Sequence, residues 1–223
     1  VLSIKRKMGE HVRVRLCNKE FSPEEISSFI LLELKKHAEK YLGKKVEKAV
    51  ITVPAYFDDR QRKATRDAGL LAGLDVVRII NEPTAASLAY DAGHPENDKL
   101  LVYDLGGGTF DVSLVVVENG VVEVKASHGD TKLGGDDFDQ LLINHVIQDF
   151  KSRHGVDLNE DLRSRRRLLV SAEKAKRELS DHPFARMREE FMYKDLHLDI
   201  EISRTNYEEM IQPLLQKTLN CIQ

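Results

Sequence analysis

Apolar and polar residues follow two periods along this chain. Apolar side chains at every second position predict strands, and apolar side chains at every third or fourth position predict helices. The mixture of the two predicts an α/β protein. In the first part of the chain the pattern predicts a strand at 11–16, a helix from Ser22 to Gly43, a strand at 48–53, a helix from 58 to 69, a strand at 75–80 and a short helix at 84–90. A three-stranded meander is predicted from 100 to about 127. After it the pattern predicts helices at 137–153 and 160–179, strand-like stretches over 187–203 and a helix at 206–219.

Local signals fix the ends of several of these elements. Ser22-Pro23-Glu24-Glu25 is a capping box with proline at the first helical position, and Gly43 can end that helix. Asn119-Gly120 predicts a two-residue turn between the second and third strands of the meander. The first helix carries its apolar stripe on Ile26, Phe29, Ile30, Leu34, His37, Ala38 and Tyr41. The helix at 137–153 is expected to bury Phe138, Leu141, Leu142, His145, Val146 and Phe150.

The most informative stretch is a glycine triplet between two acids, Asp104-Leu105-Gly106-Gly107-Gly108-Thr109-Phe110-Asp111. Strand-like runs flank it, so the glycines are expected in a tight turn between two strands. Glycines permit positive φ and leave no side chain in the way of a close ligand. Their amides and the Thr109 hydroxyl can donate to phosphate oxygens, and the two acids can hold magnesium, directly or through water. A plain glycine turn is the alternative, but the acids and the threonine favour phosphate.

Two common phosphate motifs do not fit this stretch. A Walker loop needs a lysine and then Ser or Thr after its last glycine, followed by a helix, and a Rossmann fingerprint also opens a helix. Here Phe110 and Asp111 follow Gly-Thr, and a strand is predicted next. Strand, glycine turn and strand is the order in the phosphate hairpin of actin-like ATPases and sugar kinases.

Composition narrows the choice of partners. The 223 residues, 41% of them hydrophobic and 32% charged, suffice for one large domain or two small ones. A net charge of −3 gives no general attraction to nucleic acid or to an anionic membrane. No apolar run approaches the roughly 20 residues of a membrane span, and no signal peptide is recognisable. Cys17 and Cys221 lie outside any metal spacing, which suits a reducing cytosol.

Two further patterns favour ordinary structural roles. The run Arg163-Ser164-Arg165-Arg166-Arg167 lacks interleaved aromatics, so a solvated basic helix face is favoured over RNA binding. The eight histidines have no metal-ligand spacing, and His145 lies on an apolar stripe. Neither pattern adds a function.

Four more segments accompany the glycine hairpin. They are Ala49-Val50-Ile51-Thr52-Val53-Pro54-Ala55-Tyr56-Phe57 with Arg60-Gln61-Arg62, Asn81-Glu82-Pro83-Thr84-Ala85-Ala86, 129–139 with Lys132-Leu133-Gly134-Gly135-Asp136, and Glu173-Lys174-Ala175-Lys176-Arg177-Glu178-Leu179-Ser180. In this order and spacing they resemble the ATPase domain of the seventy-kilodalton heat-shock chaperones, the DnaK type. The resemblance covers essentially the whole chain and is most specific from about Ala49 to Ser180.

The resemblance implies roles for single residues on the adenosine side. Glu173, Lys176, Arg177 and Ser180 share one helical face, and they match the family's adenosine-binding helix. A carboxylate there can accept ribose hydroxyl hydrogen bonds, and an arginine plane can stack on adenine. Gly135 is implied as a further nucleotide contact. Without the resemblance, a solvated ion-paired face would be the better interpretation.

The resemblance also implies roles on the phosphate side. Lys5 matches the family's catalytic lysine, a positive clamp on the γ-phosphate and the attacking water. Glu82 matches a glutamate near the γ-phosphate. Asp104 and Asp111 match acids that hold the water shell of Mg²⁺ and accompanying ions such as K⁺, and Asp104 can accept a proton from the attacking water. Pro54 and Arg62 resemble a switch that reports the nucleotide state.

The expected architecture is therefore an incomplete actin-like ATPase fold, with ribonuclease H-like mixed sheets and flanking helices. Residues 1–97 resemble the end of the first lobe, and residues 98–223 resemble the first part of the second lobe with its α/β tip; the connector 95–98 marks the boundary. The implied parent is a cytoplasmic chaperone that hydrolyses ATP to ADP and thereby gates binding of unfolded polypeptides. Implied partners are a J-domain cochaperone and a nucleotide exchange factor.

Both ends of the chain suggest truncation, because it starts at Val1 and stops just after a helical pattern. No Asp-Leu-Gly-Thr-Thr hairpin precedes Lys5 and no Gly-Gly-Ser-Thr-Arg loop follows Ser180, so we expect the chain alone to hold ATP weakly and to be a poor ATPase. Three alternatives stay open. They are an actin-like filament or cell-shape protein, a sugar kinase, and a non-hydrolysing nucleotide-binding module.

Overall fold

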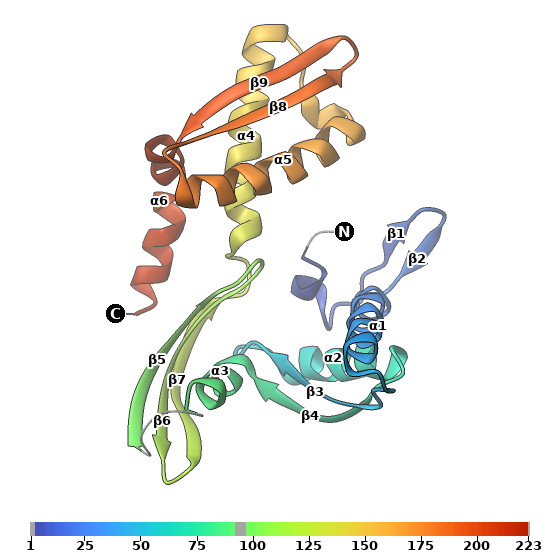
Figure 1. The fold of residues 1–223 in the computed structure, drawn as a ribbon, viewed down its shortest axis with the longest axis vertical. Coiled ribbons are helices and arrows are strands. Elements are labelled where there is room, and N and C mark those ends of the chain that lie inside the picture. The colour runs from blue at the N-terminus through green and yellow to red at the C-terminus, as the bar shows by residue number, and fades with distance from the viewer. Residues whose placement is uncertain (1–2, 92–96, 223) are drawn as a thin grey trace. The chain divides into compact units, whose positions relative to one another are not determined.

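A computed structural model describes residues 3–91 and 97–222 of the chain (Figure 1). The chain forms two compact units, one extending to Lys132 and the other beginning at Leu133. We call them unit 1 and unit 2 and treat each by itself. Both mix helices with small sheets, so the α/β prediction is confirmed at that level.

Unit 1 opens with a short helical turn, a hairpin and a long helix. The elements are η1 (Ile4–Lys7), β1 (Val14–Leu16), β2 (Lys19–Phe21) and α1 (Pro23–Leu42). The predicted capping box is present, because the Ser22 hydroxyl accepts from the Glu25 amide and the Glu25 carboxylate accepts from the Ser22 amide. Gly43 ends α1 with φ 64°, as expected.

A parallel strand pair with two helices follows in unit 1. The elements are β3 (Lys48–Val53), α2 (Asp59–Leu71), β4 (Asp75–Asn81) and α3 (Glu82–Asp91). The Asp58 side chain caps α2 by accepting from the Gln61 amide. Met8, Val53, Phe57, Ala64 and Ala68 form a buried cluster between these elements.

The third part of unit 1 is an antiparallel sheet in the order β5-β6-β7. Its strands are β5 (Asn97–Leu105), β6 (Phe110–Glu118) and β7 (Val121–Asp130), and α3 packs beside them (Figure 1). Asn119 and Gly120 both have positive φ, 52° and 74°, so the predicted turn is confirmed. The predicted connector includes residues 95 and 96, which lie outside the described residues.

Unit 2 combines three helices with one hairpin. Its elements are α4 (Gly135–His154), η2 (Leu158–Glu160), α5 (Leu162–Asp181), β8 (Phe184–Tyr193), β9 (Leu196–Ser203) and α6 (Arg204–Asn220). Helix α5 packs along β8 and against α4, and it buries Leu168, Ala172, Ala175 and Leu179. The predicted adenosine residues lie on the flank of α5 beside this buried stripe, with Glu173, Arg177 and Ser180 exposed and Lys176 partly buried.

Two apolar stripes differ from the prediction. On α1 only Ile26 of the large stripe residues is buried, whereas Phe29, Ile30 and Leu34 are half exposed and Tyr41 is 90% exposed. On α4 the buried set includes Ile143 and Ile147, whereas Leu141 and His145 are only half-buried. In both helices the periodicity was right, and the neighbouring elements decided how much of the stripe is covered.

The lobe assignment of residues 1–97 and 98–223 stays a prediction. None of the helices among the described residues has the length and apolar character needed to cross a membrane.

Candidate functional site

The glycine triplet forms a tight turn between two paired strands, as predicted. Strand β5 ends at Leu105 and β6 begins at Phe110, and the Gly106 amide donates to the Thr109 carbonyl at 2.9 Å. Asp104 and Asp111 are directly opposite cross-strand partners. Because opposite residues of an antiparallel pair point to the same face, the two carboxylates share one face of the sheet. Like charges in that position destabilise a sheet.

The glycines are used for space rather than for an unusual backbone. None of Gly106, Gly107 and Gly108 has φ in the left-handed region, so the positive φ that glycine permits is not used in this turn. The space left by the missing side chains is therefore the property that distinguishes these glycines. A Cβ on Gly108 would lie 3.1 Å from the Ser3 hydroxyl, whereas one on Gly107 would meet nothing within 4 Å. The turn is therefore open at Gly107, whereas the Ser3 side chain lies close to Gly108.

Asp111 is the most perturbed acid at this turn. It is 4% exposed, and its Oδ1 has no hydrogen-bond partner. Burial, followed by the charges of Glu82 and Asp104, raises its pKa from 3.8 to about 6, although Lys5 and the backbone amide of Tyr56 act in the opposite direction. A buried carboxylate oxygen without a donor is costly unless a cation or ordered water completes it.

Glu82 and Lys5 join the same cluster of charges. The Lys5 ammonium lies 2.7 Å from Glu82 Oε1, with 45% of the lysine side chain and 18% of the glutamate side chain exposed. Glu82 is the first residue of α3, and Lys5 lies in η1. Among the described residues, Lys5 is thus held by an acid of the predicted site. Its role as a phosphate clamp rests on the resemblance, because the structure pairs it with a carboxylate.

Arg62 of α2 braces the segment that follows β3. Its Nε donates to the Phe57 carbonyl at 3.0 Å, and its Nη2 donates to Asn81 Oδ1 at 2.7 Å and to the Ala55 carbonyl at 3.3 Å. The buried Pro54 starts this segment, and its carbonyl accepts from the Phe57 amide. One guanidinium therefore ties the turn after β3 to the residue just before Glu82, which is suitable geometry for a switch.

The sequence did not single out Tyr56 and His128. The Tyr56 amide stabilises ionised Asp111, and its phenol lies 3.3 Å from His128 Nδ1 on β7. The turn braced by Arg62 therefore contacts the acidic sheet face. No sequence signal identifies a backbone amide as a ligand, so only the structure reveals this link.

On α5 the four predicted adenosine residues divide into two kinds. Arg177 and Glu173 form an exposed ion pair at 2.7 Å, which leaves both side chains accessible. The Ser180 hydroxyl makes only a 3.5 Å contact to the Lys176 carbonyl. Lys176 is different, because its ammonium lies 2.8 Å from Asp139 Oδ1 and donates to the Gly135 carbonyl at 3.2 Å. Three of the side chains are thus exposed to solvent, and the fourth is held by α4.

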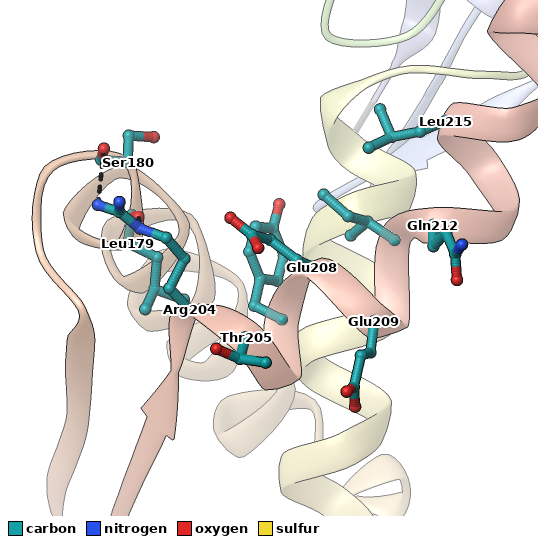
Figure 2. A pocket seen from close by; sticks show the side chains of 10 residues that line it. Leu179, Ser180, Arg204, Thr205, Glu208, Glu209, Gln212 and Leu215 are labelled. Carbon is teal, nitrogen blue, oxygen red and sulfur yellow. Dashed lines mark hydrogen bonds between the residues drawn. The ribbon is translucent and has the colours of Figure 1, made fainter.

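A hollow of about 680 Å³ adjoins the end of α5 (Figure 2). Arg204 donates to the Leu179 and Ser180 carbonyls at 2.7 and 2.9 Å and so holds this helix end. Only Ser180 of the predicted adenosine residues lines the hollow, and Glu208 and Glu209 face it as well. Its lining residues include two acids and one cation, Arg204, whose guanidinium already binds the two carbonyls at the end of α5.

The residues present fit a magnesium ion bound through water better than one bound directly. Within residues 3–91 and 97–222, no three His, Cys, Asp or Glu side chains are close enough to hold a metal ion. The unpartnered Asp111 oxygen and the opposed Asp104 nevertheless supply carboxylate oxygens, which Mg²⁺ prefers, and Mg²⁺ usually keeps several of its waters.

The hairpin with its paired acids is a strand–glycine–strand turn with two opposed carboxylates at its base. The family model described as Hsp70 protein matches residues 2–223. The chain therefore belongs to the Hsp70 family. The match is consistent with the nucleotide-binding domain of these ATP-dependent chaperones.

Proposed function

We propose that the hairpin from Asp104 to Asp111 binds the phosphates of ATP or ADP together with Mg²⁺, and that the exposed face of α5 binds adenosine. The chain would then be part of the nucleotide-binding domain of a chaperone that hydrolyses ATP to ADP and phosphate. The observation that carries the proposal is the cross-strand pair Asp104–Asp111, with one carboxylate oxygen buried and unpartnered. Nothing in the packing of a plain turn requires two acids there.

Charge explains why this pair favours a cation. Burial and the neighbouring acids oppose ionisation of Asp111, and Lys5 compensates only in part. A magnesium ion with its water shell would relieve this repulsion and would bring phosphate oxygens to the glycine turn. Asp104 and Asp111 would hold the ion through water, with K⁺ as an accompanying ion. Bound there, the ion would neutralise charge that develops on the phosphates.

Gly106, Gly107, Gly108 and Thr109 would supply the close approach to phosphate. The open space at Gly107 supports this assignment. Glu82, Asp104 and Lys5 surround the acidic face, so a water attacking the γ-phosphate would meet both proton acceptors and a cation there. The catalytic assignment of these residues remains part of the proposal.

On α5, Glu173 would accept from the ribose hydroxyls and Arg177 would stack on the base. Both side chains are at least half exposed, and their mutual ion pair can open at little cost because exposed pairs contribute only about 0–1 kcal/mol. Lys176, Ser180 and Gly135 complete the proposed contact surface.

The family supports the rest of the proposal. It implies an actin-like fold, a cytoplasmic location, unfolded polypeptides as clients, and a J-domain cochaperone and an exchange factor as partners. Pro54 and Arg62 would transmit the nucleotide state, because Arg62 binds both the turn after β3 and the residue before Glu82.

Titration calorimetry with ADP and with inorganic tripolyphosphate, each with Mg²⁺ or with a chelator, tests the phosphate half. We expect Mg²⁺ to strengthen both interactions, and Asp104→Asn and Asp111→Asn to abolish the strengthening. Glu123→Gln on β7 is the matched control, because Glu123 is exposed and pairs with Lys125. Binding of both ligands that is indifferent to Mg²⁺ and to both variants would contradict the proposed site.

A further inference from the structure

Asp139 is the buried acid of unit 2 that no sequence motif assigned to a role. It lies on the second turn of α4 and is 8% exposed, and the side chain of its partner Lys176 is 22% exposed. Acids are almost never buried to this extent unless they are paired. The pairing is with a residue of the proposed adenosine face.

The geometry makes Lys176 a bridge between two helices. Its ammonium lies 2.8 Å from Asp139 Oδ1 and 3.2 Å from the Gly135 carbonyl, so α4 presents two acceptors one turn apart to one lysine of α5. Oδ1 has no aligned hydrogen-bond donor, so the contact is an ion pair rather than a well-directed hydrogen bond. An ammonium has three donors, and two of its directions are already taken.

We infer that Asp139 is a positioning residue for the adenosine site: it holds Lys176 in one place, with its remaining donor directed by α4. The inference rests on the proposed adenosine role of α5. An unheld lysine has a flexible four-carbon stem and loses rotamer freedom when it binds a ligand. Fixing it in advance removes that cost from nucleotide binding.

The neighbours of the pair support positioning over simple packing. Desolvation raises the pKa of Asp139, and Lys176 is the main opposing influence. A group kept only for packing would be better replaced by an apolar residue, because buried ion pairs rarely add stability. Burial, followed by the charge of Asp139, raises the pKa of the Tyr207 phenol on α6, so a third element lies beside the pair.

The first measurement does not depend on nucleotide. Amine acetylation of the full chain, quantified by mass spectrometry, reports how accessible the Lys176 ammonium is. We expect Asp139→Asn to increase Lys176 acetylation several-fold and to leave Lys174 unchanged, since Lys174 is an exposed lysine on the same helix. Asp149→Asn is the matched control, because Asp149 lies on α4 but pairs with Arg153. Equal Lys176 acetylation in wild type and Asp139→Asn would overturn the inference.

The second measurement separates adenosine from phosphate. We expect Asp139→Asn to weaken ADP binding about tenfold, the scale of losing an interaction with a charged group, and to leave tripolyphosphate binding unchanged. Lys176→Met should have a similar effect, and the double variant should be no weaker than Lys176→Met alone. Additive losses, or equal losses for both ligands, would show a merely structural role and overturn the inference.

The two measurements also separate this inference from the proposed function. If wild type binds tripolyphosphate but no ADP, the adenosine assignment of α5 fails, and the positioning role fails with it. If wild type binds ADP and Asp139→Asn changes neither acetylation nor affinity, only the positioning role fails.

Discussion

The buried Asp111 carboxylate should make unit 1 less stable as pH rises. Its pKa is raised from 3.8 to about 6, so in the folded chain it keeps its proton over a range in which the unfolded chain releases it. Its favourable contribution is therefore complete below about pH 4 and is lost as pH rises through about 6. Asp111→Asn removes the ionisation, and we expect the variant to be the more stable protein at pH 7.5.

The size of the effect follows from the shift. About two pKa units at 1.36 kcal/mol each give an upper limit of about 3 kcal/mol, and solvent screening near the turn lowers this to about 1–3 kcal/mol. Near pH 4 the two proteins should differ by much less, because the wild-type carboxyl is then protonated. The stabilisation by Asp111→Asn should thus grow between pH 4 and pH 7.5.

Hydrogen exchange in peptides that cover β6 is a suitable assay, because it reports on unit 1 alone. After correction for intrinsic exchange rates, protection in Phe110–Glu118 gives the free energy of opening at each pH. Glu123→Gln should show no comparable pH-dependent gain, because its carboxylate is exposed on β7. If the difference between Asp111→Asn and wild type were constant from pH 4 to pH 7.5, the raised pKa would be refuted.

Three further predictions concern unit 1. Gly129→Ala should lower the free energy of unfolding of unit 1 by about 3 kcal/mol or more in urea, because the added Cβ would overlap the Phe110 carbonyl of β6. Gly107→Ala, whose added Cβ meets no atom within 4 Å, should unfold like wild type. Arg62→Met should cost about 1.5–3 kcal/mol, with proteolysis starting in the turn after β3, since three acceptors lose a charged donor. Lys5→Met should raise the pKa of Asp111 further, because the charge of Lys5 opposes the rise. The pKa can be followed by carboxyl NMR shifts, and an unchanged value would show that Lys5 does not influence the ionisation of Asp111.

Local signals in the sequence predicted most of the elements. The capping box at Ser22, the helix start at Asp58 and the Asn119-Gly120 turn each satisfy backbone groups within a few residues, so no distant contact is needed. The β1–β2 hairpin was only half predicted, because β2 is a three-residue polar strand and its turn places Cys17 at φ 55°, which no turn preference favours.

Burial was harder to predict than secondary structure. The stripe of α1 has helical spacing, yet Ile30 and Leu34 face a groove of about 600 Å³ that runs beside β3. Periodicity shows which residues share a face, but only the neighbouring elements determine whether that face is covered.

The site residues divide in the same way. The side chains of the hairpin and of α5 follow from motifs that are contiguous in sequence. The Tyr56 amide and Asp139 act through contacts between segments distant along the chain, from the turn after β3 to β6 and from α4 to α5. Sequence patterns contain no information on which of many acids becomes buried against a particular lysine or amide.

Asp111 and Asp139 share an unusual condition that links the two proposals. Among the described residues, they alone have buried side-chain oxygens without an aligned hydrogen-bond partner, and desolvation raises the pKa of both. Each unit thus places one poorly satisfied carboxylate beside residues that match nucleotide contacts. Such groups reduce stability, so packing alone does not account for them. A ligand that supplies a cation at Asp111 would explain why that carboxylate is buried despite its cost in stability. A ligand that uses the lysine held by Asp139 would explain the same for Asp139. On this view a phosphate ligand should stabilise unit 1 in a Mg²⁺-dependent way, and an adenosine ligand should stabilise unit 2 independently of Mg²⁺.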